Sequence, residues 1–125
     1  MTDPPETPDF LRDLVQVQLI RTPEDVRVVV SGEIDLGTAP RVEERSRMAR
    51  RGQGGNCLVL DLRGVTFMDS TGLRLLMQLL DDAEQHRYAL TIVRPPQNVQ
   101  RVIEIAGLDR LLPLVDEPTE RATAP

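Results

Sequence analysis

The residues best suited to chemistry in this sequence form one short block, Asp69-Ser70-Thr71-Gly72. Ser70 stands where a helix should begin, so we predict that it is the N-cap, with its hydroxyl facing the free N–H groups of the first turn. Those groups and the helix dipole favour negative charge, and a phosphate would add about 1.5 to 2 negative charges there. Gly72 would let another protein approach the hydroxyl, while Asp69 would repel the phosphate. The block is therefore a candidate phosphorylation site whose modification breaks a protein contact; a plain helix cap is the alternative.

Few other residues could support catalysis. All 15 basic side chains are arginines, and without lysine there is neither a Walker P-loop nor a Schiff base. His86 and Cys57 are the only residues of their types, so a zinc site of Cys and His ligands cannot be built. We interpret His86 as a surface residue and Cys57 as a small core residue. We expect no enzyme and no cofactor.

Three carboxylates leave one alternative of a different class. Asp35, Asp61 and Asp69 lie near the ends of predicted strands, where α/β folds place their sites, and they could serve a metal- or nucleotide-binding domain. No glycine-rich phosphate loop supports that interpretation.

Composition excludes several partners. The net charge is −5, and the aromatic residues are two Phe, one Tyr and no Trp, which argues against phosphate contacts and base stacking on nucleic acid. The first residues do not form a signal peptide, and no apolar run is long enough for a membrane span. We expect a soluble, cytoplasmic protein; the sequence does not predict its oligomeric state.

Periodicity predicts the elements that position the block. Alternating apolar residues predict a hairpin of two strands, followed by helices that alternate with strands. The expected strands are 14–21, 25–31, 57–62 and 89–93; the expected helices begin after Thr38 as N-cap, at Ser70 and after Pro95-Pro96; and 111–115 is either a short helix or an edge strand. This order predicts an α/β domain with a mixed, mostly parallel sheet of four to five strands, an N-terminal hairpin and helices packed against it. We expect one domain at 13–117 and flexible tails at 1–12 and 118–125.

Several blocks together resemble the STAS-domain anti-sigma factor antagonists of bacteria. They are Val30-Ser31-Gly32-Glu33-Ile34-Asp35, Thr38-Ala39, Leu58-Val59-Leu60-Asp61-Leu62, Phe67-Met68-Asp69-Ser70-Thr71-Gly72-Leu73 and Ile105-Ala106-Gly107-Leu108. The resemblance covers roughly residues 14 to 116. The Gly-Glu-Ile-Asp and Met-Asp-Ser-Thr-Gly-Leu blocks are its most specific parts.

The resemblance implies a function by partner switching in transcription regulation, as in bacterial stress responses. In that family an anti-sigma factor that is also a serine kinase phosphorylates the serine that matches Ser70. The unphosphorylated antagonist binds the anti-sigma factor and frees a sigma factor, and a PP2C-type phosphatase restores it. By the same resemblance, Asp35, Asp69, Thr71 and Gly72 belong with Ser70 to one binding surface, although Asp35 could simply cap the next turn. A phosphorylation-independent STAS scaffold in another signalling assembly is the alternative within this class.

Overall fold

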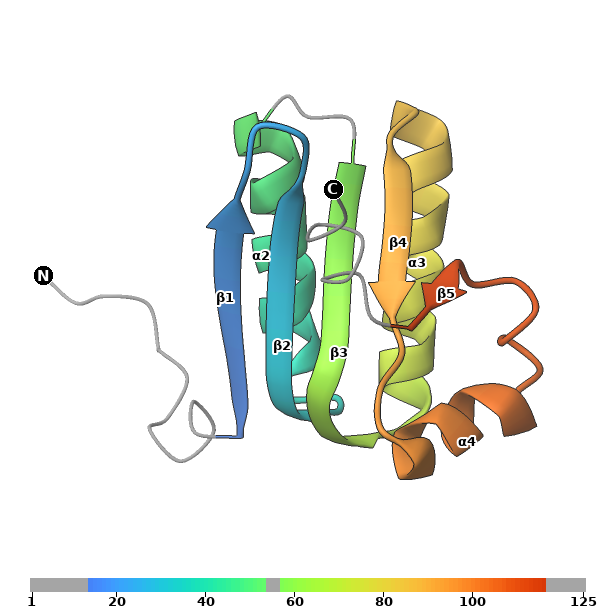
Figure 1. The fold of residues 1–125 in the computed structure, drawn as a ribbon. Coiled ribbons are helices and arrows are strands. Elements are labelled where there is room, and N and C mark those ends of the chain that lie inside the picture. Colours follow the sequence, from blue (N-terminus) through green and yellow to red (C-terminus); the bar gives the residue numbers. More distant parts are fainter. Residues whose placement is uncertain (1–13, 54–56, 117–125) are drawn as a thin grey trace, which may run out of the picture.

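The computed structural model describes residues 14–53 and 57–116, which form one sheet with three helices (Figure 1). The elements are β1 (Val15–Arg21), β2 (Val26–Ile34), α2 (Ala39–Gln53), β3 (Cys57–Met68), α3 (Ser70–His86), β4 (Ala89–Val93), α4 (Gln97–Ile105) and β5 (Leu114–Val115). The strands lie in the order β1-β2-β3-β4-β5. The predicted α/β fold with an N-terminal hairpin is confirmed, and the open alternative at 111–115 resolves to an edge strand. The tails predicted at 1–12 and 118–125 lie outside the described residues.

Among the described strands, only the β1–β2 hairpin is antiparallel. β1 pairs with β2 from Val15 opposite Gly32 to Arg21 opposite Val26, and every later pair of neighbouring strands is parallel. Parallel neighbours need crossover connections, which α2, α3 and α4 provide. As a result β2, β3 and β4 all run toward the same edge of the sheet; β4 stops opposite Asp61, and β2 and β3 end at that edge, the lower edge in Figure 1. We call this the carboxyl edge.

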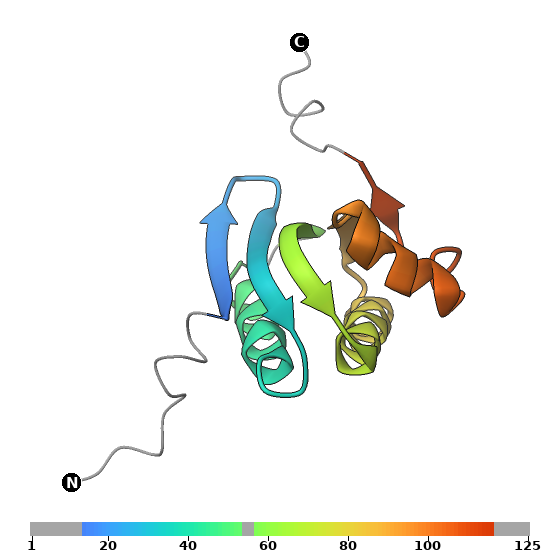
Figure 2. The ribbon, with the colours of Figure 1, turned by 90° about the horizontal axis from the view of Figure 1, so that it is seen from below.

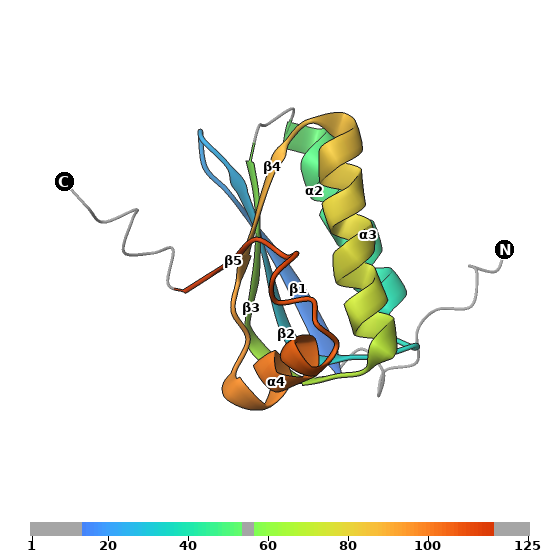
Figure 3. The same ribbon diagram turned by 90° about the vertical axis from the view of Figure 1, so that its right-hand side faces the viewer.

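The core lies between the sheet and two helices. α2 and α3 cover one face of the sheet, and α4 lies beneath the carboxyl edge (Figure 3). The period of two along β2 and β3 and the period of 3.6 along the helices direct apolar side chains into this layer. The residues concerned are at most 5% exposed: Val26, Val28, Val30, Leu58, Leu60, Leu62, Ala39, Val42, Ala49, Leu75, Leu76 and Leu79.

β3 is longer than the sequence predicted. It was expected to end at Leu62, but it continues to Met68 beside the end of β2, with Glu33 opposite Phe67 and Ile34 opposite Met68. The polar residues after Leu62 interrupt the apolar pattern, and two register shifts in the β2–β3 pairing accommodate them. The extension carries the chain directly to Asp69, the residue before α3.

α4 follows its predicted signals. It begins at Gln97 after Pro96 and ends at Ile105, and Gly107 adopts a left-handed φ of 76° just beyond its C-cap Ala106. Among the described residues, no helix is long and apolar enough to cross a membrane.

Candidate functional site

Two loops meet at the carboxyl edge. One joins β2 to α2 through residues 35–38, and the other joins β3 to α3 through Asp69. The backbone N–H of Asp69 donates to the carbonyl of Ile34 at 3.3 Å, so the two loops are hydrogen-bonded neighbours. Figure 2 looks onto this edge from below. The fold therefore brings the loop of Asp35 next to Asp69 and the first residue of α3, while their membership of one binding surface stays a prediction.

Asp69, and not Ser70, caps α3. The Asp69 backbone is extended (φ −112°, ψ −165°), and its carboxylate oxygen Oδ1 accepts hydrogen bonds from the N–H groups of Thr71 at 2.8 Å and Gly72 at 3.3 Å. Ser70 is the first residue of the helix. The prediction that Ser70 is the N-cap is therefore wrong by one position. Aspartate caps a helix as well as serine does, and its charge also suits the helix dipole.

The Asp69 cap determines what surrounds the Ser70 hydroxyl. Ser70 is exposed, and the two N–H groups that it was expected to face are already bound to Asp69. A phosphate on Ser70 would stand beside the Asp69 carboxylate and would have to compete with it for the helix N-terminus. The serine is thus accessible for modification without having a capping role to lose.

Gly72 acts inside the molecule. It is buried, and a Cβ at this position would overlap Cγ of Met68 and lie 3.2 Å from Cγ2 of Ile34. The expectation that Gly72 opens a path for another protein is therefore replaced by a packing role: the glycine lets α3 lie against the ends of β2 and β3. Thr71 is half-buried.

Asp35 organises the other loop. Its Oδ1 accepts hydrogen bonds from the N–H groups of Gly37 at 3.0 Å and Thr38 at 3.2 Å. Thr38 precedes the helix as predicted, but its buried hydroxyl donates to the Glu33 carbonyl at 2.7 Å and accepts from the Asp35 N–H at 2.9 Å. The turn-capping role weighed for Asp35 is thus present, and the carboxylate remains partly exposed at the carboxyl edge.

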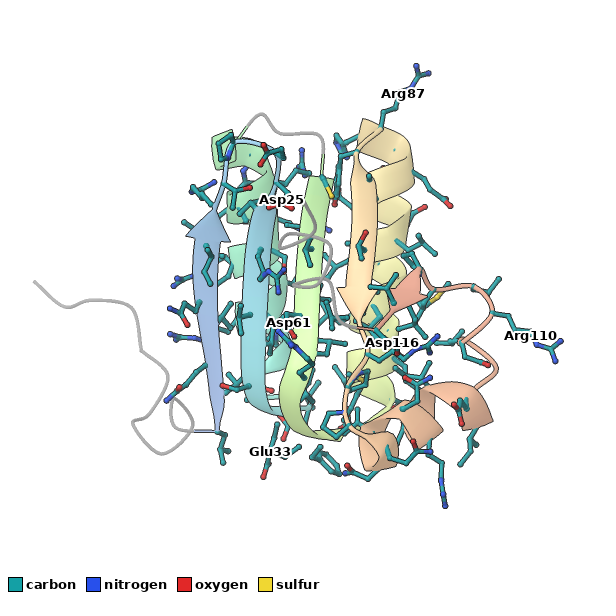
Figure 4. All side chains as sticks on the ribbon, viewed as in Figure 1. Asp25, Glu33, Asp61, Arg87, Arg110 and Asp116 are labelled. Atoms are coloured by element: carbon teal, nitrogen blue, oxygen red, sulfur yellow. The ribbon has the colours of Figure 1, made fainter. Side chains whose placement is uncertain are left out.

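Asp61 lies elsewhere. It faces away from α2 and α3 in the middle of β3, where Figure 4 labels it, and it pairs with Arg63 at 2.7 Å and Arg27 at 3.2 Å. Burial raises the pKa of Asp61, but the hydrogen bonds from Arg63 and the charges of Arg63 and Arg27 outweigh burial, so that its pKa lies below 3.8. The three carboxylates of the metal-binding alternative therefore do not converge. In residues 14–53 and 57–116, no group of three or more His, Cys, Asp or Glu side chains could hold a metal.

His86 lies far from Ser70. The two residues stand at opposite ends of α3, which has 17 residues, and a rise of about 1.5 Å per residue separates them by about 24 Å. Figure 4 labels Arg87, next to His86, at the upper end of α3 and Glu33 at the opposite, lower edge of the sheet. His86 Nδ1 instead lies 3.1 Å from Oδ1 of Asp82. Ser70 therefore has no histidine base within reach in this fold.

The fold and the two loops define a class of protein. Residues 16–121 match the STAS domain family, and the chain belongs to that family. Its relatives include the anti-sigma-B factor antagonist of Staphylococcus aureus strain NCTC 8325 / PS 47, which is 37% identical over 93 residues, or 74% of this chain and 84% of that protein. The anti-sigma-B factor antagonist of Staphylococcus epidermidis is 32% identical over 106 residues, 85% of this chain and 96% of that protein.

Solved structures of anti-sigma factor antagonists have the same fold. An anti-sigma factor antagonist from Mycobacterium paratuberculosis superposes with a TM-score of 0.77 at 28% identity, covering 89% of this chain and 93% of that one. The Bacillus cell fate determinant SpoIIAA in its phosphorylated form shares the fold, with a TM-score of 0.65 at 21% identity over 86% of this chain and 96% of that one. Within the STAS domains, this chain belongs to the anti-sigma factor antagonists, as its motifs predicted.

Proposed function

We propose that this protein is a phosphorylation-controlled antagonist. In its unphosphorylated form it binds an anti-sigma factor that is also a serine kinase, and so frees a sigma factor. Phosphorylation of Ser70 ends this contact, and a PP2C-type phosphatase restores it. The observation that supports the proposal most directly is the exposure of Ser70 as the first residue of α3, with the capping role taken by Asp69.

Charge explains how one phosphate would act as a switch. The surface already carries Asp69 next to Ser70 and Asp35 on the neighbouring loop. A phosphate would add about 1.5 to 2 negative charges there, and a partner that docks against this edge would have to bury them. Placing like or unpaired charges in an interface costs several kcal/mol. No rearrangement of the fold is required, and a protein of this fold has been solved with its phosphate in place.

The same geometry favours a substrate over a catalyst. Ser70 has no imidazole in reach, and its immediate neighbour Asp69 is engaged with the backbone. A serine nucleophile needs an adjacent base, which these neighbours do not supply. We infer that the hydroxyl receives a phosphoryl group from another protein and that the chain itself catalyses no reaction.

The proposal is tested by mapping the phosphate. The wild type, Ser70→Ala and Thr71→Ala are incubated with ATP and candidate anti-sigma kinases, and the products are analysed by mass spectrometry. We expect one phosphate on the wild type and on Thr71→Ala, and none on Ser70→Ala. A phosphate on Thr71, or kinase binding with no phosphate on any residue, would contradict the proposed switch. The latter result would support a phosphorylation-independent STAS contact.

Magnesium and nucleotide titrations address the alternative of a different class. A ligand that binds only the native state raises its stability by RT ln(1 + L/Kd), where L is the free ligand concentration, so Tm rises with the logarithm of that concentration above Kd. We expect no shift in Tm with magnesium or with ATP. A Tm that rises with ligand concentration in the wild type, but not in Asp35→Asn or Asp69→Asn, would favour the metal- or nucleotide-binding interpretation.

A further inference from the structure

Large apolar side chains are exposed at seven places in the described part of the chain. They are Ile20, Leu36, Met48, Phe67, Ile105, Leu111 and Val115. Exposed apolar residues are common on soluble proteins, so exposure alone says little. Two of the seven, Leu36 and Phe67, stand out because they belong to the two loops and strand ends that meet beside Ser70.

Leu36 projects from a loop that is closed by several hydrogen bonds. It is 77% exposed, and it follows Asp35, whose carboxylate binds the next two N–H groups, Gly37 and Thr38. The buried Thr38 hydroxyl also ties the loop to the Glu33 carbonyl at 2.7 Å. A side chain on a loop ordered in this way loses little further freedom when it is buried by a partner.

Phe67 is fixed on the neighbouring strand. It is 47% exposed, lies opposite Glu33 in the β2–β3 register and comes two residues before the cap Asp69. The strand is secured here from two sides: Asn98 of α4 donates to the Thr66 carbonyl at 3.2 Å, and the following Met68 is buried. Aromatic side chains, phenylalanine included, are enriched at the buried core of protein interfaces.

Carboxylates surround both residues. Glu33 lies opposite Phe67, Asp35 precedes Leu36, and Asp69 follows Phe67 by two positions. Figure 4 shows Glu33 at the lower end of β2, at this edge. A surface of two apolar groups among carboxylates fits an apolar depression bordered by Arg or Lys side chains.

We propose that Leu36 and Phe67 are the apolar anchors of the contact with the anti-sigma factor, and that Ser70 is the charge switch placed beside them. This inference rests on the function proposed above. The proposal assigns two different roles to residues of one surface. The anchors supply the affinity of the unphosphorylated protein, and the phosphate cancels it by adding charge that the partner cannot bury.

The chain supplies matched controls for a test. Ile105 is 80% exposed on α4, which matches Leu36, and Met48 is 46% exposed on α2, which matches Phe67. Binding of a cognate anti-sigma kinase is measured by calorimetry for the wild type and for Leu36→Ala, Phe67→Ala, Ile105→Ala and Met48→Ala, all unphosphorylated. Thermal unfolding is recorded for each variant, and Leu36→Met and Phe67→Leu test whether apolar bulk restores binding.

We expect Leu36→Ala and Phe67→Ala each to raise Kd at least tenfold, as truncation of an interface anchor does, with Tm unchanged and with recovery in the conservative variants. The two controls should bind like the wild type. Equal Kd values for all four alanine variants, or equal weakening by Ile105→Ala and Leu36→Ala, would overturn the anchor assignment while the wild-type contact stands. Absence of wild-type binding to every anti-sigma kinase tested would instead overturn the proposed function itself.

Discussion

At the start of α3, the Asp69 carboxylate caps the helix, so the Ser70 hydroxyl is not needed as a cap. Asp69 satisfies two N–H groups that would otherwise lack an acceptor. Replacing it with alanine should lower the free energy of unfolding by about 1 kcal/mol, in the usual range for the loss of a cap. Asp69→Asn should retain most of that stability, because asparagine is also a good N-cap. Urea denaturation of the two variants checks this; equal losses in both would show that the charge, and not the cap, matters.

Gly72 provides a second test at the same scale. Alanine is favoured over glycine within a helix by about 1 kcal/mol. Here its Cβ would overlap Met68 Cγ, and overpacking of a core costs about 1 to 3 kcal/mol. We therefore expect Gly72→Ala to be destabilising by about 1 kcal/mol in urea denaturation. A more stable variant would mean that Met68 moves freely and that the close packing of α3 is not required.

The sequence located the block but not the roles of its members. Aspartate and serine are interchangeable at the first boundary of a helix, so the spacing alone could not decide which of Asp69 and Ser70 is the cap. The role of Gly72 depends on Met68 and Ile34, which approach it only once β2 and β3 are paired. The sequence shows that position 72 is a glycine, but it does not show which neighbouring side chains leave no room for a Cβ there.

Between elements, one buried carboxylate on α3 connects this helix to α2 and to Tyr88, the residue before β4. Asp82 is 5% exposed and lies 3.0 Å from Arg50 and 3.4 Å from Arg47 on α2, and it accepts the Tyr88 hydroxyl at 2.8 Å. Asp82 lies next to Asp81 near the C-terminal end of α3, where a negative charge is unfavourable for the helix dipole. Its ion pairs with Arg47 and Arg50 on α2 explain why a carboxylate is stable at this position.

Tyr88→Phe and Asp82→Ala measure this connection. Losing the hydroxyl removes one hydrogen bond to a carboxylate, and losing the carboxylate leaves the Tyr88 hydroxyl and Arg50 without their partner. We expect a loss of about 1 kcal/mol for Tyr88→Phe and about 2 kcal/mol for Asp82→Ala in chemical denaturation. Phosphorylation of Ser70 should be unchanged in both, because the site lies at the other end of α3. A lost phosphate in a folded Tyr88→Phe variant would contradict this separation.

On the opposite face of the sheet, the Asp61 pairs make stability depend on pH. The pKa of Asp61 is lowered in the folded protein, so the charged form is favoured there. Its contribution is therefore present above the unfolded pKa, near 3.8, and is lost as the pH falls through the lower folded pKa. Asp61→Asn should cost about 1 to 2 kcal/mol at pH 7, allowing for the exposure of Arg63. The difference from the wild type should shrink below about pH 4. A difference that stays constant in unfolding experiments from pH 7 to pH 2 would contradict the assignment.

For the whole molecule, periodicity predicted most of the architecture. The hairpin, the crossovers through α2 and α3 and the helix after Pro96 follow from alternation, helical spacing and the Pro and Gly signals. The second half of β3 was missed because Arg63, Gly64 and Thr66 break its apolar pattern. Its pairing with β2 is a long-range interaction that no local pattern contains. That extension also places Phe67 opposite Glu33. The arrangement of side chains around Ser70 therefore could not be predicted from the sequence alone.

The proposed switch gives this surface different affinities for the anti-sigma kinase before and after phosphorylation of Ser70, and the most direct measurement compares the two forms. The protein is prepared unphosphorylated and with a phosphate on Ser70, and the Kd of each form for its anti-sigma kinase is determined under the same conditions. We predict that the phosphate raises Kd by at least about 100-fold, because its charge must be buried beside carboxylates. Equal affinity of the two forms, with the phosphate confirmed on Ser70, would contradict the account.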